Sequence, residues 1–219
     1  MSAAEVMQAE CWVRDKYASP HPWAGGAFRV FHGDSITNGS DTSGALMNYP
    51  ARVAALNGWP IGTWTNLGHG GQSMAGLRAE AIVDIDPMVR LLGKTPLHLA
   101  AWEWYNQRAA ADPQNETISY FRARRDAGIA RLILATSTDA ADRFETKETL
   151  AKRAAYHAFF DANWRTHADA YVPLHADSRI GVEGACPATS PYGAYFSDGI
   201  HLTDAGYEAV AGLVAPAMA

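Results

Sequence analysis

Residues 28–37 read FRVFHGDSIT, an apolar run that passes directly into Gly33, Asp34 and Ser35. A short apolar run bounded by turn residues is typical of a buried strand in a parallel sheet. Four more runs of this kind follow, with helical periodicity between them. This alternation predicts a three-layer α/β/α sandwich with a five-stranded parallel sheet. The expected strands are 28–32, 63–67, 97–102, 131–135 and 170–174, and the expected helices are 45–56, 73–92, 115–127, 146–168 and 203–215.

Length and composition restrict the class of protein. The chain has 219 residues, of which 48% are hydrophobic and 19% charged, and its formal net charge is −5. These values fit one globular domain with a sizeable core and exclude a disordered or collagen-like chain. The densest basic cluster, at 122–125, is short, so we expect no nucleic-acid partner. Cys11 and Cys186 form neither a disulfide framework nor a metal-binding spacing.

The N-terminal region does not resemble a targeting segment. It lacks the basic stretch and apolar run of a secretory signal, and no part of the chain is apolar for long enough to span a membrane. By default we therefore expect a soluble, cytoplasmic protein. Residues 1–25 end in a Pro/Gly-rich stretch (SPHPWAGG) and are interpreted as an extension that packs on the domain formed by residues 26–219.

The position of Ser35 makes it a candidate nucleophile. In a parallel sheet covered by helices, functional groups gather on the loops at the carboxyl ends of the strands. Ser35 lies on such a loop, where backbone N–H groups of the turn can also stabilise an oxyanion. The alternative is that Asp34 and Ser35 only cap the next helix.

A serine nucleophile needs a base, and His69, His175 and His201 lie on loops at the same predicted edge of the sheet. Asp198 precedes His201 by three residues, so one short turn can present both side chains. Asp198 can then hold the imidazole while its other ring nitrogen meets the serine. Asp204 is the alternative carboxylate, and we assign it instead to the first turn of the following helix.

Three sequence blocks resemble those of the SGNH (GDSL-type) hydrolases. GDSIT at 33–37 is similar to the first block, NLGHGGQS at 66–73 to the second, and SDGIHLTDAGYEAVA at 197–211 to the last. The blocks occur in the family's order and span most of the chain. The resemblance implies a flavodoxin-like fold and a serine esterase. Such an enzyme would act on a small-molecule or carbohydrate ester and would need no cofactor or metal.

The resemblance also assigns roles to individual residues. Ser35 is the nucleophile, and Asp198 and His201 complete a catalytic triad. The backbone N–H groups of Ser35 and Gly71 and the side-chain amide of Asn106 form the oxyanion hole. The ester would pass through an acyl-enzyme, and activity is expected to fall in acid as the histidine base becomes protonated.

The third block departs from the family pattern. The family usually has Gly-x-Asn-Asp, and this chain has Trp104-Tyr105-Asn106-Gln107. Trp104 in place of the glycine predicts a narrow acyl pocket and a short acyl group, from acetyl to butyryl. The alternative is that Trp104 lies in the core. His69, beside the oxyanion glycine, is a further candidate for contact with substrate, and a packed or solvated histidine is the alternative.

Ser73 is an alternative candidate nucleophile, and two other functions are compatible with the sequence. Ser73, in GQSMA at 71–75, approximates the G-x-S-x-G elbow of α/β-hydrolases. Only two apolar runs precede it and Ala75 replaces the last glycine, so we interpret Ser73 as a helix N-cap. One alternative function is an acyltransferase that uses the same residues. The other is a carbohydrate-binding or structural module on a degenerate hydrolase scaffold.

Overall fold

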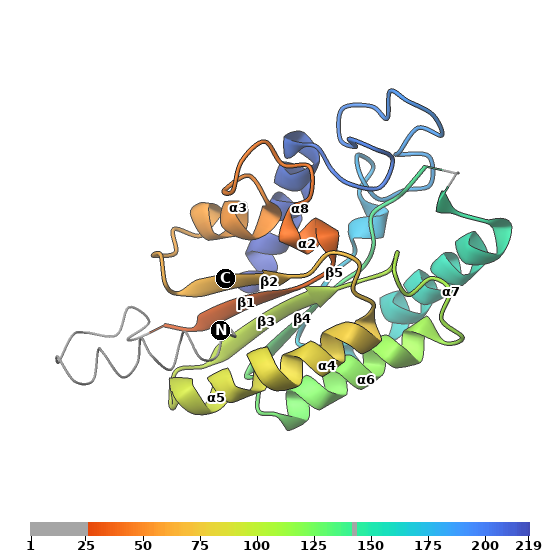
Figure 1. Ribbon diagram of the computed structural model, residues 1–219. Coiled ribbons are helices and arrows are strands. Elements are labelled where there is room, and N and C mark those ends of the chain that lie inside the picture. Colours follow the sequence, from red (N-terminus) through yellow and green to blue (C-terminus); the bar gives the residue numbers. More distant parts are fainter. Residues whose placement is uncertain (1–25, 142–143) are drawn as a thin grey trace.

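The computed structural model describes residues 26–141 and 144–219, so the predicted extension at 1–25 lies outside the described residues. The centre of the protein is a five-stranded parallel sheet in the order β2-β1-β3-β4-β5 (Figure 1). The strands are β1 (Phe28–Gly33), β2 (Trp64–Gly68), β3 (Leu97–Trp102), β4 (Arg131–Ala135) and β5 (Ala170–Val172). All five predicted strands are confirmed, with small differences at their ends.

Helices cover both faces of this sheet. In Figure 1, α3 and α8 lie on one face, and α4, α5, α6 and α7 lie on the other. The helices are α2 (Ser35–Asn38), α3 (Tyr49–Leu56), α4 (Met74–Asp84), α5 (Asp86–Leu92), α6 (Pro113–Asp126), α7 (Lys147–Asn163), η2 (Trp164–Thr166), η3 (Leu174–Ala176) and α8 (Asp204–Met218). The three-layer α/β/α architecture and the flavodoxin-like strand order are those predicted.

Two predicted helices differ from the observed ones because of prolines. The segment predicted as one helix at 73–92 forms two, α4 and α5, because Pro87 has no backbone N–H to continue the ladder. The helix predicted from residue 45 begins only at Tyr49, where Asn48 caps it and Pro50 lies in the first turn.

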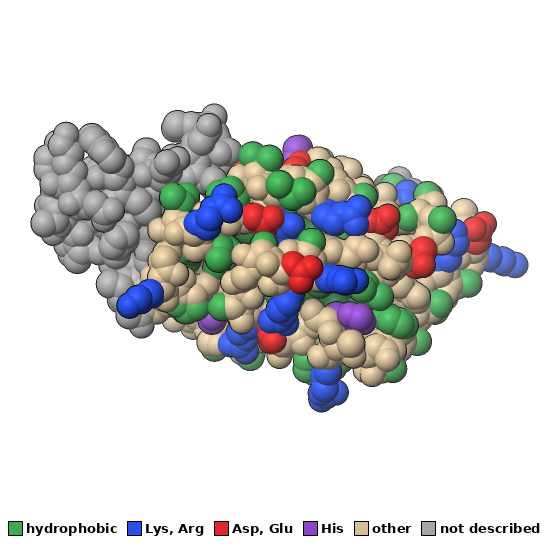
Figure 2. Space-filling model, turned by 90° about the horizontal axis from the view of Figure 1, so that it is seen from below, with side chains coloured by type: hydrophobic (Ala, Val, Ile, Leu, Met, Phe, Trp, Pro, Cys, Tyr) green, Lys and Arg blue, Asp and Glu red, His purple; other side chains and the backbone are tan. Residues whose placement is uncertain are grey.

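The core consists of the side chains between the sheet and its two helical layers. Val30, Leu99 and Ile133 on the central strands are fully buried, as are Leu77 on α4 and Val210 on α8. None of the helices in the described part of the chain is long and apolar enough to cross a membrane. On the face drawn in Figure 2, basic and acidic side chains are interspersed rather than gathered by sign.

The strand order places a topological switch point between β1 and β3. β1 and β3 are neighbours, with Gly33 beside Trp102 at their carboxyl ends. The chain leaves β1 toward α3 on one face and leaves β3 toward α6 on the other face (Figure 1). In α/β sheets, ligands usually bind beside such a switch point, at the carboxyl ends of the strands.

Candidate active site

Ser35 lies at this switch point, as the first residue of the single-turn helix α2. The carboxylate of Asp34 caps this turn by accepting the N–H of Ile36 at 2.9 Å. The Ser35 hydroxyl has a different partner, because its Oγ lies 2.9 Å from Nε2 of His201. Capping therefore explains Asp34 but not the side chain of Ser35.

Close packing fixes the position of the serine turn. A Cβ atom on Gly68 would overlap the backbone of Asn38, and one on Gly33 would overlap the side chain of Thr37. Trp102 adds a hydrogen bond from its Nε1 to Thr37 Oγ1 at 2.8 Å. These two glycines of the first and second sequence blocks thus allow β1, β2 and α2 to approach closely.

A second short turn carries the other two residues of the predicted triad. Phe196 and Leu202 form an antiparallel bridge that closes the turn. Gly199 within it has a φ of 95°, a backbone conformation that residues with a Cβ rarely adopt. Asp198 Oδ1 accepts the backbone N–H groups of Ile200 at 2.9 Å and His201 at 2.8 Å. The aspartate is therefore fixed by the turn on which it lies.

Ser35, His201 and Asp198 form one continuous chain of hydrogen bonds. Nδ1 of His201 lies 2.9 Å from Asp198 Oδ2, and Nε2 lies 2.9 Å from Ser35 Oγ. Burial raises the pKa of Asp198, but hydrogen bonds from Ile200 and His201 outweigh it and hold that pKa below its usual value. A carboxylate that stays ionised can orient the imidazole, and the imidazole can then take the serine proton.

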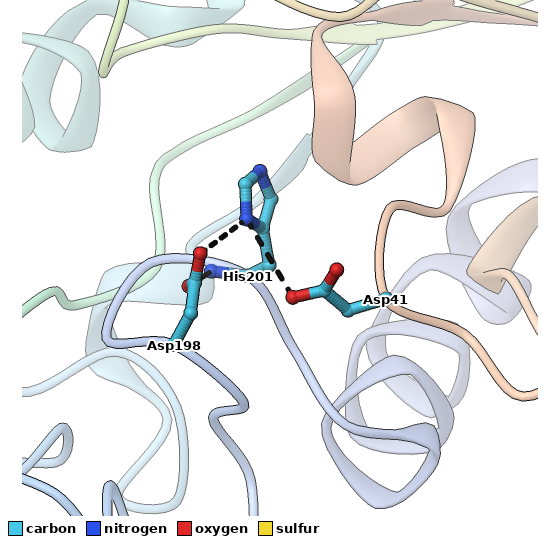
Figure 3. A group of neighbouring side chains, drawn as sticks. All are labelled: Asp41, Asp198 and His201. Atoms are coloured by element: carbon cyan, nitrogen blue, oxygen red, sulfur yellow. Dashed lines mark hydrogen bonds and ion pairs between the residues drawn. The ribbon is translucent and has the colours of Figure 1, made fainter.

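Asp41 is a second carboxylate at the same histidine (Figure 3). Its Oδ2 lies 3.9 Å from His201 Nδ1 and accepts a hydrogen bond from Ser197 Oγ at 2.7 Å. Its φ of 66° is positive, which is uncommon for a residue other than glycine. One potential ligand atom from each of Asp41, Asp198 and His201 lies within 4.8 Å of the others. No sequence motif marks Asp41, because only the tertiary fold brings it to His201.

Two side-chain bridges join the loop after α2 to the segment that carries the histidine. One is the bond from Ser197 to Asp41. In the other, the backbone N–H of Ser43 donates to Asp204 Oδ1 at 3.1 Å, and its hydroxyl donates to Asp204 Oδ2. Asp204 lies in the first turn of α8, as predicted, and its carboxylate bonds Ser43.

The second sequence block lies against the serine turn. A Cβ atom on Gly70 would lie 3.8 Å from Ser35 Cβ, so the loop that follows β2 contacts this turn. Asn66 supports the arrangement by donating from Nδ2 to the backbone oxygen of Thr37 at 2.8 Å. Gly71, the predicted oxyanion donor, has a φ of 80° on this loop.

Asn106 is exposed on the loop that leaves β3. Its backbone N–H donates to Glu103 Oε1 at 2.6 Å. Glu103 is buried, and burial together with the nearby charge of Asp34 raises its pKa well above the usual value. Burial also raises the pKa of Asp34, to about 6. Glu103 is not among the site residues predicted from the sequence, although its position directly after a buried strand is a usable signal.

Trp104 lies in the core and not beside an acyl pocket, which is the alternative that the sequence left open. Its side chain is 1% exposed and packs against Tyr156 of α7 with ring centroids 5.1 Å apart. The expectation that Trp104 narrows an acyl pocket therefore has no support from its position. His69 is 61% exposed on the loop after β2, and its Nδ1 lies 2.6 Å from Glu80 Oε1.

Two other candidates have structural roles. Ser73 caps α4 by accepting the N–H of Gly76, which is the N-cap interpretation given above. His175 lies between Thr136 and Asp161, at 2.8 Å and 3.2 Å, and stacks on His157 with ring centroids 4.1 Å apart. These two histidines line a cavity of about 400 Å³ that no triad residue lines.

Comparison with known proteins identifies the fold. No protein-family model and no curated protein sequence matches the chain. Among solved structures, a GDSL-like lipase from Bacteroides thetaiotaomicron superposes with a TM-score of 0.66 at 18% identity, covering 97% of both chains. A member of the lipolytic G-D-S-L family from Veillonella parvula gives 0.61 at 16% identity, covering 86% of this chain and 96% of that one.

A two-domain esterase active on acetylated mannans is also similar, with a TM-score of 0.57 and 16% identity. The match covers 92% of this chain and 51% of the esterase chain, so this protein corresponds to about half of the esterase. These likenesses confirm the expected fold: the chain has the α/β/α fold of the GDSL-type lipolytic proteins and esterases.

Proposed function

We propose that the protein is a serine esterase of the SGNH (GDSL-type) hydrolase family. The observation that carries the proposal is the chain of hydrogen bonds from Asp198 through His201 to Ser35, with 2.9 Å at each step. Residues far apart in the sequence meet in this chain at the switch point of the sheet. The fold shared with GDSL-type proteins supports the same conclusion.

The reaction follows from the roles of the three side chains. Ser35 Oγ attacks the ester carbonyl while His201 Nε2 takes its proton, and Asp198 holds the imidazole at Nδ1. The imidazolium then returns the proton to the departing alcohol, leaving an acyl group on Ser35. Water attacks this acyl-enzyme with His201 again as base, which releases the acid and restores the serine.

The oxyanion hole would consist of groups from three loops. The backbone N–H groups of Ser35 and Gly71 and the side-chain amide of Asn106 are the proposed donors. The contact between the Gly70 segment and Ser35 supports the assignment of Gly71. The exposed position of Asn106 after β3, the strand beside β1, supports that of the amide. Such donors stabilise the charge that develops on the carbonyl oxygen.

The proposed substrates are esters of short acyl groups, from acetyl to butyryl, on a small molecule or carbohydrate. The similar esterase that acts on acetylated mannans supports the acetyl end of this range. We place His69 at the rim of the site, because its exposed side chain neighbours the Gly70 segment. Initial rates on acetyl, butyryl and octanoyl p-nitrophenyl esters test the acyl range, and product analysis with an added alcohol separates hydrolysis from acyl transfer.

Covalent labelling with a fluorophosphonate tests the function directly. The wild-type protein and the Ser73→Ala variant should both be labelled, and Ser35→Ala should not. Label that persists in Ser35→Ala and disappears in Ser73→Ala would move the nucleophile to Ser73. A folded wild-type protein that is neither labelled nor active on esters would contradict the proposal and favour a binding module on the same scaffold.

A further inference from the structure

Two buried carboxyl groups lie on either side of the switch point. Gly33 and Trp102 are paired residues at the ends of β1 and β3, and Asp34 and Glu103 are the residues that follow them. Each of the two carboxyl side chains is 2% exposed. Burying two like charges close together is unfavourable, so the buried carboxyl group of Glu103 calls for contacts that offset this cost.

The contacts of Glu103 show what this group does locally. Its Oε1 accepts the backbone N–H of Asn106 at 2.6 Å, and its backbone oxygen accepts Nε2 of Gln107 at 2.8 Å. The hydrogen bond from the Asn106 backbone acts against the rise in the pKa of Glu103. Glu103 therefore fixes the turn that carries Asn106, through the backbone of Asn106 and the side chain of Gln107.

The same turn exposes one residue only. Trp104, Tyr105 and Gln107 are between 1% and 4% exposed, whereas Asn106 is exposed. A turn anchored by three buried side chains presents the fourth at a fixed place. The family resemblance leads one to expect an aspartate after this asparagine, and the chain has Gln107 there instead.

We propose that Glu103 is a positioning residue that holds Asn106 in the oxyanion hole from three residues upstream, in place of an aspartate after Asn106. The inference rests on the proposed function, because it assigns a task to Glu103 only if Asn106 binds an oxyanion. The oxygen of Glu103 that accepts the Asn106 N–H holds the turn, and a negative charge on Glu103 is not needed for this. A side chain of the same length with a neutral acceptor should therefore replace it.

Kinetics of four variants on a p-nitrophenyl ester test this proposal. Asn106→Ala should lower kcat by about 10²- to 10³-fold, the usual effect of removing one oxyanion donor. Glu103→Asp keeps the charge but withdraws the acceptor, and should lower kcat by about 10- to 100-fold with little change in KM. Glu103→Gln keeps the reach and removes the charge, and should retain kcat within about threefold. Asn106→Ala combined with Glu103→Asp should be no slower than Asn106→Ala alone.

The opposite results overturn the proposal. An active Glu103→Asp beside an impaired Glu103→Gln would show that the charge is what matters. If the fold-loss in kcat of the double variant equals the product of the two single fold-losses, Glu103 does not act through Asn106. Glu116→Asp, on α6 and outside the site, is the control for shortening a glutamate and should keep the wild-type kcat. A wild-type protein that is inactive and unlabelled would overturn the proposed function and this inference together. Independent fold-losses in kcat, in an active protein, would overturn the inference alone.

Discussion

Asp41 and Asp198 approach the same ring nitrogen of His201 from two sides, at 3.9 Å and 2.9 Å respectively (Figure 3). Only Asp198 is within hydrogen-bonding distance, and it is also fixed by two backbone N–H groups of its own turn. Asp41 is held instead by Ser197. Asp198 should therefore contribute more than Asp41 to the orientation of the imidazole.

The first prediction concerns this inequality. Asp198→Asn should lower kcat by about 10³- to 10⁴-fold, because an amide no longer holds the required imidazole tautomer. Asp41→Asn should lower it by less than about tenfold, since asparagine also tolerates a positive φ and the lost contact is long. Steady-state kinetics on one ester would measure both. Equal losses in the two variants would mean that Asp41 shares the role assigned to Asp198.

The second prediction concerns the buried cap of the serine turn. Burial raises the pKa of Asp34 to about 6, whereas an unfolded chain has about 3.9. The folded state thus binds this proton more tightly, and stability falls as the pH rises between these two values. Asn caps a helix as well as Asp without carrying a charge. Asp34→Asn should lie close to the wild type near pH 4 and exceed its free energy of unfolding by about 3 kcal/mol above pH 7.

Urea denaturation at the two pH values measures this difference. Asp112→Asn, which makes the same change at the exposed cap of α6, is the matched control, and the gain in Asp34→Asn at pH 7.5 should exceed the effect of this control. A less stable Asp34→Asn at pH 7.5 would show that the surroundings stabilise the ionised Asp34 carboxylate, which contradicts a raised pKa.

The third prediction separates the two interpretations of Trp104. Because its indole packs in the core against Tyr156, Trp104→Ala should lower the free energy of unfolding by about 3–5 kcal/mol. Trp104→Phe should lower it less, and neither variant should prefer longer acyl chains. Denaturation and rates on octanoyl esters test this together. A stable Trp104→Ala with a selective gain on octanoyl esters would restore the pocket interpretation.

The fourth prediction concerns the glycine at the end of β2. Gly68→Ala must displace the backbone of Asn38, so it should destabilise the protein and lower kcat by moving the serine turn. Gly212, on α8, has open space around its Cα, and Gly212→Ala should raise stability by up to about 1 kcal/mol without changing kcat. Wild-type kinetics for Gly68→Ala would mean that the turn can shift without effect on the site.

The parts of the protein that the sequence predicted are those with a local signal. The five strands were predicted because buried parallel strands appear as continuous apolar runs. Ser35, Asp198 and His201 were found because each lies on a short turn with its own motif, and the structure brings all three together. Helix ends were less well predicted where Pro50 and Pro87 decide them.

Other residues have no local signal. Asp41 meets His201 through the packing of the loop after α2 against the segment before α8, which no motif records. Glu103 was not singled out, because its task depends on the pairing of β1 with β3 and on the turn that follows. Trp104 was ambiguous, since an aromatic residue at the end of a strand can face either the core or a pocket.

The bridges from Ser197 to Asp41 and from Ser43 to Asp204 also bear on how the protein unfolds when heated. Both are exposed, whereas Ser35 is anchored through buried contacts at the centre of the sheet. Exposed contacts open at lower free energy than a packed core. The segment with Asp198 and His201 is itself anchored in the core by Phe196 and Leu202. On heating, the loop after α2 that carries Asp41 and Ser43 should therefore separate from this segment by local unfolding before the sheet melts.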